Sequence, residues 1–275
     1  MLRRFRFTAF LAFLALGIMA VLPLAGSAAS ADAMIRVVHA SPDAPAVDVY
    51  LNGQRAISNL KFTEGTTYAS VPAASYKVQV FPAGAAPTGK AVIEATLDLK
   101  GGTAYTVAAV NVLAKIEPIV LTDDLTAPAA GKAHIRVIHA SPDAPAVDVA
   151  VKGGPVPFKN AAFKAATPYA PVDAGTYTFE IRPTGTTTAV LTTDPTALAA
   201  GKIYSVFAMG QVANNTLKVV AFVDNSAPGM PSTGGGAMAG NQNSGLQLAL
   251  VGGLVLLVTA VGLRVARPLL ATRSR

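Results

Sequence analysis

HASPDAPAVDV at residues 39–49 occurs again, letter for letter, at residues 139–149. The match continues on both sides of this motif at a spacing of about 100 residues. Matched pairs outside the motif include Phe62 with Phe163, Tyr68 with Tyr169, Val71 with Val172, and Tyr76 with Tyr177. A repeat of this length is a domain and not a unit of a solenoid. The sequence therefore predicts two tandem domains, 34–128 and 132–228, and we expect each of them to fold alone.

Each repeat has the residue pattern of a β-sheet protein. Apolar and polar residues alternate in segments such as 35–38, 47–51, 76–80 and 177–181, as they do in half-buried strands. On this pattern, polar strand residues such as Asp48 face water. Clusters of Gly, Pro, Asn and Asp interrupt the repeats at short intervals, and neither repeat contains a long amphipathic helix. The predicted fold class is all-β, with two tandem antiparallel β-sandwich domains.

The topology of the sandwich stays open between two types. DAGTY at 173–177 resembles the tyrosine corner of immunoglobulin-like sandwiches, in which the tyrosine hydroxyl bonds back to the backbone. The first repeat has PAASY at 72–76 instead, so its version is degenerate. Transthyretin-like sandwiches use a similar V-x-A-G-x-Y turn. The pattern therefore predicts an immunoglobulin-like or a transthyretin-like sandwich.

The repeated motif contains residue types that are typical of catalytic sites. His39, Ser41 and Asp43 lie within five residues, but side chains two residues apart on a strand are parallel and about 6.5 Å apart. A catalytic serine must meet its histidine at hydrogen-bond distance, with a third group behind the histidine. No G-x-S-x-G elbow is present either. We therefore predict no catalytic residue and no enzymatic activity.

Metal binding is a weaker alternative for the same motif. Extracellular sandwiches hold calcium in acidic loops, and the candidate ligands here are Asp43, Asp48, Asp143 and Asp148. The D-x-D-x-D-G pattern of a calcium loop is absent. The chain has no cysteine, which excludes thiolate zinc sites, iron–sulfur clusters and cysteine nucleophiles. We predict no cofactor, and the calcium alternative stays open.

A structural role explains more of the motif. The prolines fix φ and end the first strand, and Ser41 and Asp43 can accept hydrogen bonds from amides of their own turn. His39 is expected to be a strand-end histidine with a satisfied hydrogen bond. If strands 35–40 and 46–51 are neighbours, Arg36 lies near Asp48. The predicted structural motif consists of His39, Ser41, Pro42, Asp43, Pro45 and Asp48, and of His139, Ser141, Pro142, Asp143, Pro145 and Asp148.

The two ends of the chain predict export and anchoring. Residues 1–33 have arginines, an apolar run and small residues in the order of a secretory signal peptide; the alternative is an uncleaved anchor. Residues 246–263 carry no charge and would span about 27 Å as a helix, enough to cross a bilayer. Arginines follow in 264–275, which predicts a cytoplasmic basic tail. We expect an exported, extracytoplasmic protein anchored to the cell membrane by its C-terminus.

The segment 229–245 is a flexible linker by composition. Within it, MPSTG at 230–234 resembles the L-P-x-T-G sorting signal of surface proteins that sortase attaches to the cell wall. Cleavage would fall between Thr233 and Gly234. Met replaces the usual Leu, so two interpretations stay open: a plain membrane anchor, and sortase processing with the cell wall as the final location.

The net charge of +7 comes mainly from the arginines of the two terminal segments. The exported part between them is close to neutral. The high positive charge therefore reflects targeting and topology, and it predicts no nucleic-acid partner.

The repeats carry a family resemblance. I-R-V-x-H-A-S-P-D-A-P-A-V-D-V, followed by a strand and a glycine turn, resembles the opening of the domain of unknown function 4397 family, over 34–125 and 134–225. The resemblance implies an extracytoplasmic bacterial protein with tandem β-sandwich domains and no established activity. It implies no catalytic residue. The repeats differ at Tyr50, which Ala150 replaces, so a ligand role for that tyrosine is in doubt.

Three classes of function follow, in this order. The first is a non-enzymatic cell-surface protein whose two modules serve binding or adhesion to a glycan or protein ligand. The second is a structural stalk of the cell envelope without a specific ligand. An extracellular enzyme is the least favoured, because no cluster of titratable groups recurs outside the motif.

Overall fold

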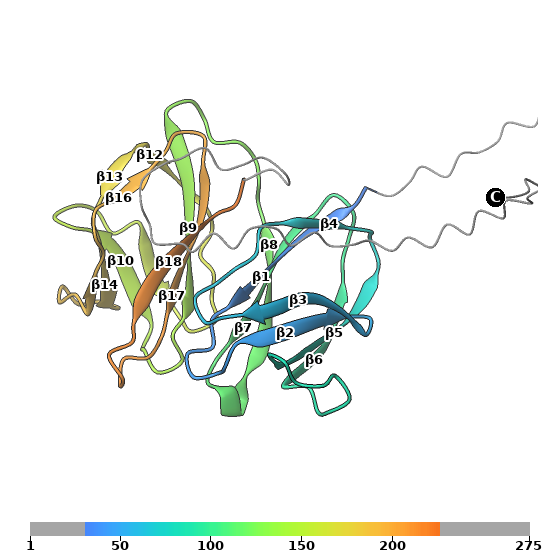
Figure 1. Cartoon of the computed structure of the whole chain (residues 1–275). Coiled ribbons are helices and arrows are strands. Elements are labelled where there is room, and N and C mark those ends of the chain that lie inside the picture. The colour runs from blue at the N-terminus through green and yellow to red at the C-terminus, as the bar shows by residue number, and fades with distance from the viewer. Residues whose placement is uncertain (1–30, 226–275) are drawn as a thin grey trace, which may run out of the picture.

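The computed structural model describes residues 31–225, which form strands and one short helix (Figure 1). The strands of the first repeat are β1 (Ala33–His39), β2 (Val47–Leu51), β3 (Gln54–Leu60), β4 (Ala69–Val71), β5 (Ser75–Pro82), β6 (Ile93–Asp98), β7 (Ala104–Val110) and β8 (Glu117–Asp123), with the 3-10 helix η1 (Leu113–Lys115) before β8. Those of the second are β9 (Lys132–Ala140), β10 (Val147–Val151), β11 (Phe158–Ala161), β12 (Ala170–Asp173), β13 (Gly175–Tyr177), β14 (Phe179–Pro183), β15 (Leu191–Thr192), β16 (Thr196–Leu198), β17 (Ile203–Met209) and β18 (Lys218–Val223).

The predictions for the chain ends fall almost entirely outside these residues. The signal peptide up to residue 30, the linker 229–245 with its Thr233–Gly234 bond, the membrane segment 246–263 and the tail 264–275 are not among the described residues. Within 31–225, no helix has the length and apolar character needed to cross a membrane.

Each repeat forms a sandwich of two sheets with the same strand order. In the first domain the sheets run β4-β1-β7-β8 and β3-β2-β5-β6. The second has β12-β9-β17-β18 and β11-β10-β14-β15, and a two-stranded sheet of β13 and β16. The predicted all-β sandwich is confirmed. The pairings are antiparallel, except that β1 pairs with β7 and β9 pairs with β17 in parallel.

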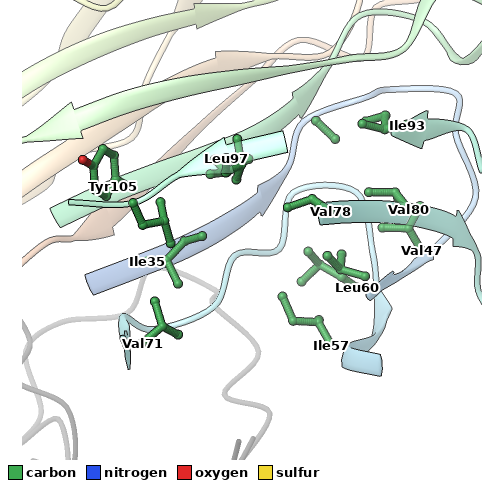
Figure 2. Close-up of a cluster of buried hydrophobic side chains, with 14 of the residues drawn as sticks. Ile35, Val47, Ile57, Leu60, Val71, Val78, Val80, Ile93, Leu97 and Tyr105 are labelled. Carbon is green, nitrogen blue, oxygen red and sulfur yellow. The ribbon is translucent and has the colours of Figure 1, made fainter. Parts of the chain in front are cut away.

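Each sandwich encloses its own apolar core. Alternate residues of the strands point inward, as the period of two requires. In the first domain these include Ile35 on β1, Val78 on β5 and Tyr105 on β7 (Figure 2). The second core is built in the same way and includes Ile135 and Phe179.

A third apolar cluster joins the two domains. The residues that alternate with the core residues on β1, β7, β9 and β17 are also buried, and they pack against the facing domain. This cluster contains Val38, Ala40, Ala108, Val110, Ile138, Ala140, Phe207 and Met209. The central strands are therefore buried on both faces, which explains their nearly continuous apolar sequences and is typical of parallel pairs.

The tyrosine corner is present in both domains. The Tyr177 hydroxyl donates to the backbone oxygen of Asp173 at 2.9 Å. The Tyr76 hydroxyl donates in the same way to Pro72, also at 2.9 Å. The corner therefore forms in the first repeat too, although PAASY lacks the aspartate and the glycine.

Candidate functional site

The histidine of the repeated motif is buried at the end of the first strand of each domain. Its Nε2 donates to the backbone oxygen of Pro45 in the first repeat and of Pro145 in the second, at 3.0 Å in both. Its Nδ1 accepts the backbone N–H of the serine two residues later, at 3.3 and 3.2 Å. Both ring nitrogens are thus occupied, as expected of a strand-end histidine, and the ring is the neutral tautomer protonated at Nε2.

This environment opposes protonation of the histidines. Burial lowers the pKa of His39 and of His139 below the ordinary histidine value, although the bond to the proline oxygen acts in the opposite direction. Each imidazole also contacts an aromatic ring edge to face, Phe62 at 6.4 Å and Phe163 at 6.2 Å between centroids. The histidine therefore connects the strand end, the turn and the core.

The serine hydroxyls do not face the histidines. Ser41 Oγ is buried and has no hydrogen-bond partner among the described residues, and Ser141 Oγ donates to Asp143 at 3.3 Å. Since each histidine uses Nδ1 for a backbone N–H, neither repeat has a serine–histidine pair of the kind that nucleophilic catalysis requires.

Asp43 and Asp143 accept hydrogen bonds from a loop outside their own turn. Asp43 accepts the backbone N–H of Leu113, after β7, at 2.7 Å. Asp143 accepts those of Val212 and Ala213, after β17, at 2.9 Å each. The prediction that Ser41 and Asp43 bond to amides of their own turn is therefore wrong, because their turn lies against the loop that follows the neighbouring strand.

Asp48 and Asp148 are buried, in contrast to the prediction that polar strand residues face water. Asp48 accepts the backbone N–H of Asn59 at 2.8 Å and that of Gly84 at 3.2 Å. Asp148 makes the matching bonds to Asn160 and to residue 185, at 2.7 and 3.1 Å. These backbone hydrogen bonds lower the pKa of Asp148. Both asparagines have a left-handed φ, of 53° and 54°, and asparagine tolerates this region well.

The four aspartates do not form a calcium site in the described structure. Their carboxylates accept backbone N–H groups, and they are divided between two positions in each domain. Within residues 31–225, no three His, Asp or Glu side chains lie close enough together to hold a metal ion. The arrangement accounts for these aspartates as acceptors that fix loops.

The contact between Arg36 and Asp48 was predicted on the condition that their strands are neighbours, and this condition is not met. β1 and β2 belong to different sheets, so Arg36 does not lie near Asp48. Its guanidinium instead crosses the domain interface and pairs with Asp224 at 2.7 Å, and it also donates to Thr106 Oγ1 at 2.8 Å. Burial is the largest single effect and opposes the charge, but the attraction of Asp224, Tyr68 and Asp123 together outweighs it, so the pKa of Arg36 lies above its ordinary value.

The arginine of the second repeat makes the equivalent contact with an aspartate of the first domain. Arg136 pairs with Asp123 of the first domain, and its Nε donates to Ser205 Oγ at 2.8 Å. Two hydroxyls complete the connections: Thr106 donates to Asp123 at 2.6 Å, and Ser205 donates to Asp224 at 2.6 Å. The contacts form a closed ring of two arginines, two aspartates and two hydroxyls, which we call the interface ring.

Two tyrosines cover the interface ring. Tyr68 donates to Asp123 at 2.5 Å, and Tyr169 donates to Asp224 at 2.7 Å. Their rings lie under the guanidinium groups of Arg36 and Arg136, at 4.8 and 4.6 Å from the centroid. Burial raises the pKa of both hydroxyls. All four charges of the ring are therefore paired and hydrogen-bonded, as buried charges must be.

Sequence reasoning missed the interface ring although its members repeat. Each repeat places an arginine between apolar strand residues, and each ends with an aspartate that aligns with the other, Asp123 and Asp224. A charged residue inside a doubly buried strand requires a buried partner. The buried arginine therefore predicts a buried acidic partner. It does not show that this partner belongs to the other domain.

Comparison with known proteins gives one family. The family model described as "Domain of unknown function (DUF4397)" matches residues 33–150 and 133–233. No curated protein matches the chain.

Two solved structures have low similarity. The Bacillus anthracis TIE protein is 10% identical, with 66% of this chain and 34% of that chain covered and a TM-score of 0.22. This chain thus spans about a third of that protein. CBMbc (family CBM26) from Eubacterium rectale Amy13K, solved in complex with maltoheptaose, is 12% identical, with 68% and 95% covered and a TM-score of 0.23. TM-scores this low support no inference about this chain.

Proposed function

Since this chain belongs to the DUF4397 family and carries two copies of its domain, we propose that it is a non-enzymatic cell-surface protein that binds a glycan or a protein through paired β-sandwiches. The histidines and aspartates of the repeated motif hydrogen-bond to the backbone of their own domain, which argues against a catalytic role for them. The interface ring joins the two domains by two buried ion pairs, so a binding surface can extend over both of them.

The observation that carries the proposal is the pair of loops held by the motif. Asp43 fixes the loop after β7 and Asp143 fixes the loop after β17. These loops expose Leu113 and Val212, at 37% and 39% of their surface. Both loops lie at the lower side of Figure 1. Binding residues are often carried on loops that a rigid scaffold positions, and these two loops are held in this way.

A binding experiment tests this surface. The full-length chain in mild detergent is applied to a glycan array and to immobilised cell-envelope proteins. We expect a signal that the Leu113→Asp/Val212→Asp variant loses. Val190→Asp is the matched control, because Val190 is exposed but lies on another loop. A signal that survives the double substitution contradicts this surface. Absence of any signal supports the structural-stalk alternative.

The proposed location needs a separate test. We propose that the protein is exported and anchored by its C-terminus, with the domain pair outside the cell. External protease on intact cells should then remove both domains and leave the C-terminal segment. A shift of the domains from the cell-wall fraction to the membrane fraction on sortase inhibition or with Thr233→Ala would indicate cell-wall attachment, whereas no change supports a plain membrane anchor. Protection of the domains from protease contradicts the topology.

A further inference from the structure

The core of the first domain is not completely filled. A cavity of about 340 Å³ lies between its two sheets. Protein interiors are close-packed, and they contain few voids larger than a water molecule. This volume lies within the range of sites that bind small molecules.

The cavity wall is apolar on both sheets. Sheet β4-β1-β7-β8 contributes Ile35 and Val107, and the opposite sheet contributes Ile57, Val78 and others. Figure 2 shows Ile35 of the first sheet and Ile57 and Val78 of the opposite sheet in the space between the two sheets. No Asp, Glu, Lys or Arg lines the cavity. A ligand inside it therefore has no charged partner and must itself be uncharged there.

The polar residues of the wall lie mainly on the segment that leads from β3 into β4. The Thr66 hydroxyl accepts the backbone N–H of Val37, and the Ser70 hydroxyl donates to Asp32. Tyr68 belongs to the interface ring. Thr67 is exposed, and its hydroxyl has no partner among the described residues. Because Thr67 and Ser70 line the cavity and are exposed, we infer that the cavity opens at this segment, with Thr67 as the polar group available to a ligand.

The second domain is an internal comparison, because it has the same fold and no such space. Its corresponding cavity measures about 20 Å³. Phe158 pairs with Val149 as Ile57 pairs with Val49, and Phe179 pairs with Val151 as Val78 pairs with Leu51. Two buried phenyl rings thus replace two aliphatic side chains. The fold can close this core, and the side chains of the first repeat leave it open.

We propose that the first domain binds an uncharged, mainly aliphatic small molecule inside its sandwich. The ligand class is a medium-length hydrocarbon chain with one polar, non-ionised end, such as a fatty alcohol or acyl ester. Its chain occupies the apolar cavity and its polar end lies at Thr67. This site is separate from the proposed surface at Leu113 and Val212, and it does not depend on that proposal.

Photolabelling of the full-length chain tests the proposal. The chain is placed in lipid nanodiscs with a dodecanol analogue that carries a diazirine, irradiated, and mapped by peptide mass spectrometry. We expect labelling of first-domain peptides that contain Ile57 or Val78, and little in the peptides that contain Phe158 or Phe179. Excess unlabelled dodecanol should remove the first-domain label. Equal labelling of the two domains, or none in the first, overturns the proposal.

Matched variants separate loss of the site from loss of the fold. Val78→Phe introduces the residue that the second domain has at the same position, and it should reduce first-domain labelling to the second-domain level. Ile57→Phe should act in the same way, and it replaces the first variant if that one fails to unfold cooperatively. The reciprocal Phe179→Val should create labelling in the second domain. A filled variant that unfolds cooperatively and is labelled as strongly as the natural chain refutes the site.

Discussion

The ring nitrogens of His39 and His139 each have one role in the folded protein. Nε2 donates to a backbone oxygen, and Nδ1 accepts a backbone N–H. A proton on Nδ1 would remove that acceptor and place a charge in a buried site. Each histidine is thus neutral and links two backbone groups of the turn, so the stability of the fold should depend on its protonation.

We expect the protein to lose stability as the pH falls below about 6.5, the ordinary histidine value. Below it the unfolded chain takes up a proton at each histidine, whereas the folded protein does so only at its lower pKa. The contribution of the two histidines to the free energy of unfolding is therefore complete above about pH 6.5, and it decreases as the pH falls toward their pKa in the folded protein. Urea unfolding between about pH 7.5 and 5 measures it. A His39→Gln/His139→Gln variant should show a flatter dependence, and an equal slope in both proteins would contradict this assignment.

The aspartates of the turn make a second prediction at this scale. Asp143→Ala removes two backbone hydrogen bonds and Asp43→Ala removes one. We expect losses of about 0.5–2 kcal/mol in the free energy of unfolding, larger for Asp143. Thermal unfolding with calcium and with chelator is the control. A calcium-dependent shift that Asp43→Ala abolishes would instead support the calcium alternative.

At the scale of elements, the tyrosine corner closes the same turn in both domains. Tyr76→Phe and Tyr177→Phe each remove one hydroxyl and keep the ring. We expect each to cost about 0.5–1.5 kcal/mol, the value of one hydrogen bond. Urea unfolding measures the cost. Tyr50→Phe is a suitable control, because no hydrogen bond of its hydroxyl is present in the described structure. Equal costs at the three positions would show that the corner bond contributes nothing.

The strands also show how far sequence reasoning reaches. Alternation predicted that segments such as 47–51 are strands, because one face of each is apolar. It did not predict that strands such as β1 are buried on both faces, because nothing local distinguishes a face that meets water from one that meets another domain. The actual partners of Asp43 and Arg36 were missed for the same reason: they are 70 and 188 residues away.

The interface ring and the apolar cluster that joins the domains could not be predicted from the residue pattern of a single repeat. The sequence correspondence predicted two equal units and nothing about their contact. The cavity also escaped prediction, since Val78 and Phe179 are equally good core residues by pattern. Their difference appears only when volumes are compared inside the same fold.

At the scale of the molecule, the shared core bears on whether the domains fold alone. Separated from its partner, the first domain would expose Val38 and Val110 and leave Arg36 without Asp224. We therefore expect fragments 31–128 and 129–225 to be unstable or to self-associate alone, and to form a one-to-one complex when mixed. Analytical ultracentrifugation measures this. Two monomeric fragments that melt cooperatively and do not associate would restore the expectation of independent folding.

The last prediction concerns the interface ring. Arg36→Met leaves the fully buried Asp224 without its counter-charge, and breaking a buried pair in this way costs about 3–5 kcal/mol. The control lies at the same interface: Lys164 pairs with Glu117 at 3.2 Å, but both are about 40% exposed. Lys164→Met should therefore cost less than about 1 kcal/mol. Urea unfolding of the full-length chain compares the two.

The double variant Arg36→Met/Asp224→Leu separates charge from packing in the same experiment. It removes both charges, so it should recover part of the loss caused by Arg36→Met, because an unpaired buried charge costs more than an apolar replacement of the pair. Recovery stays partial, since Tyr169 and Ser205 lose their acceptor. If Arg36→Met costs no more than Lys164→Met, the ring does not hold the domains together. The shared apolar cluster would then be the main source of their association.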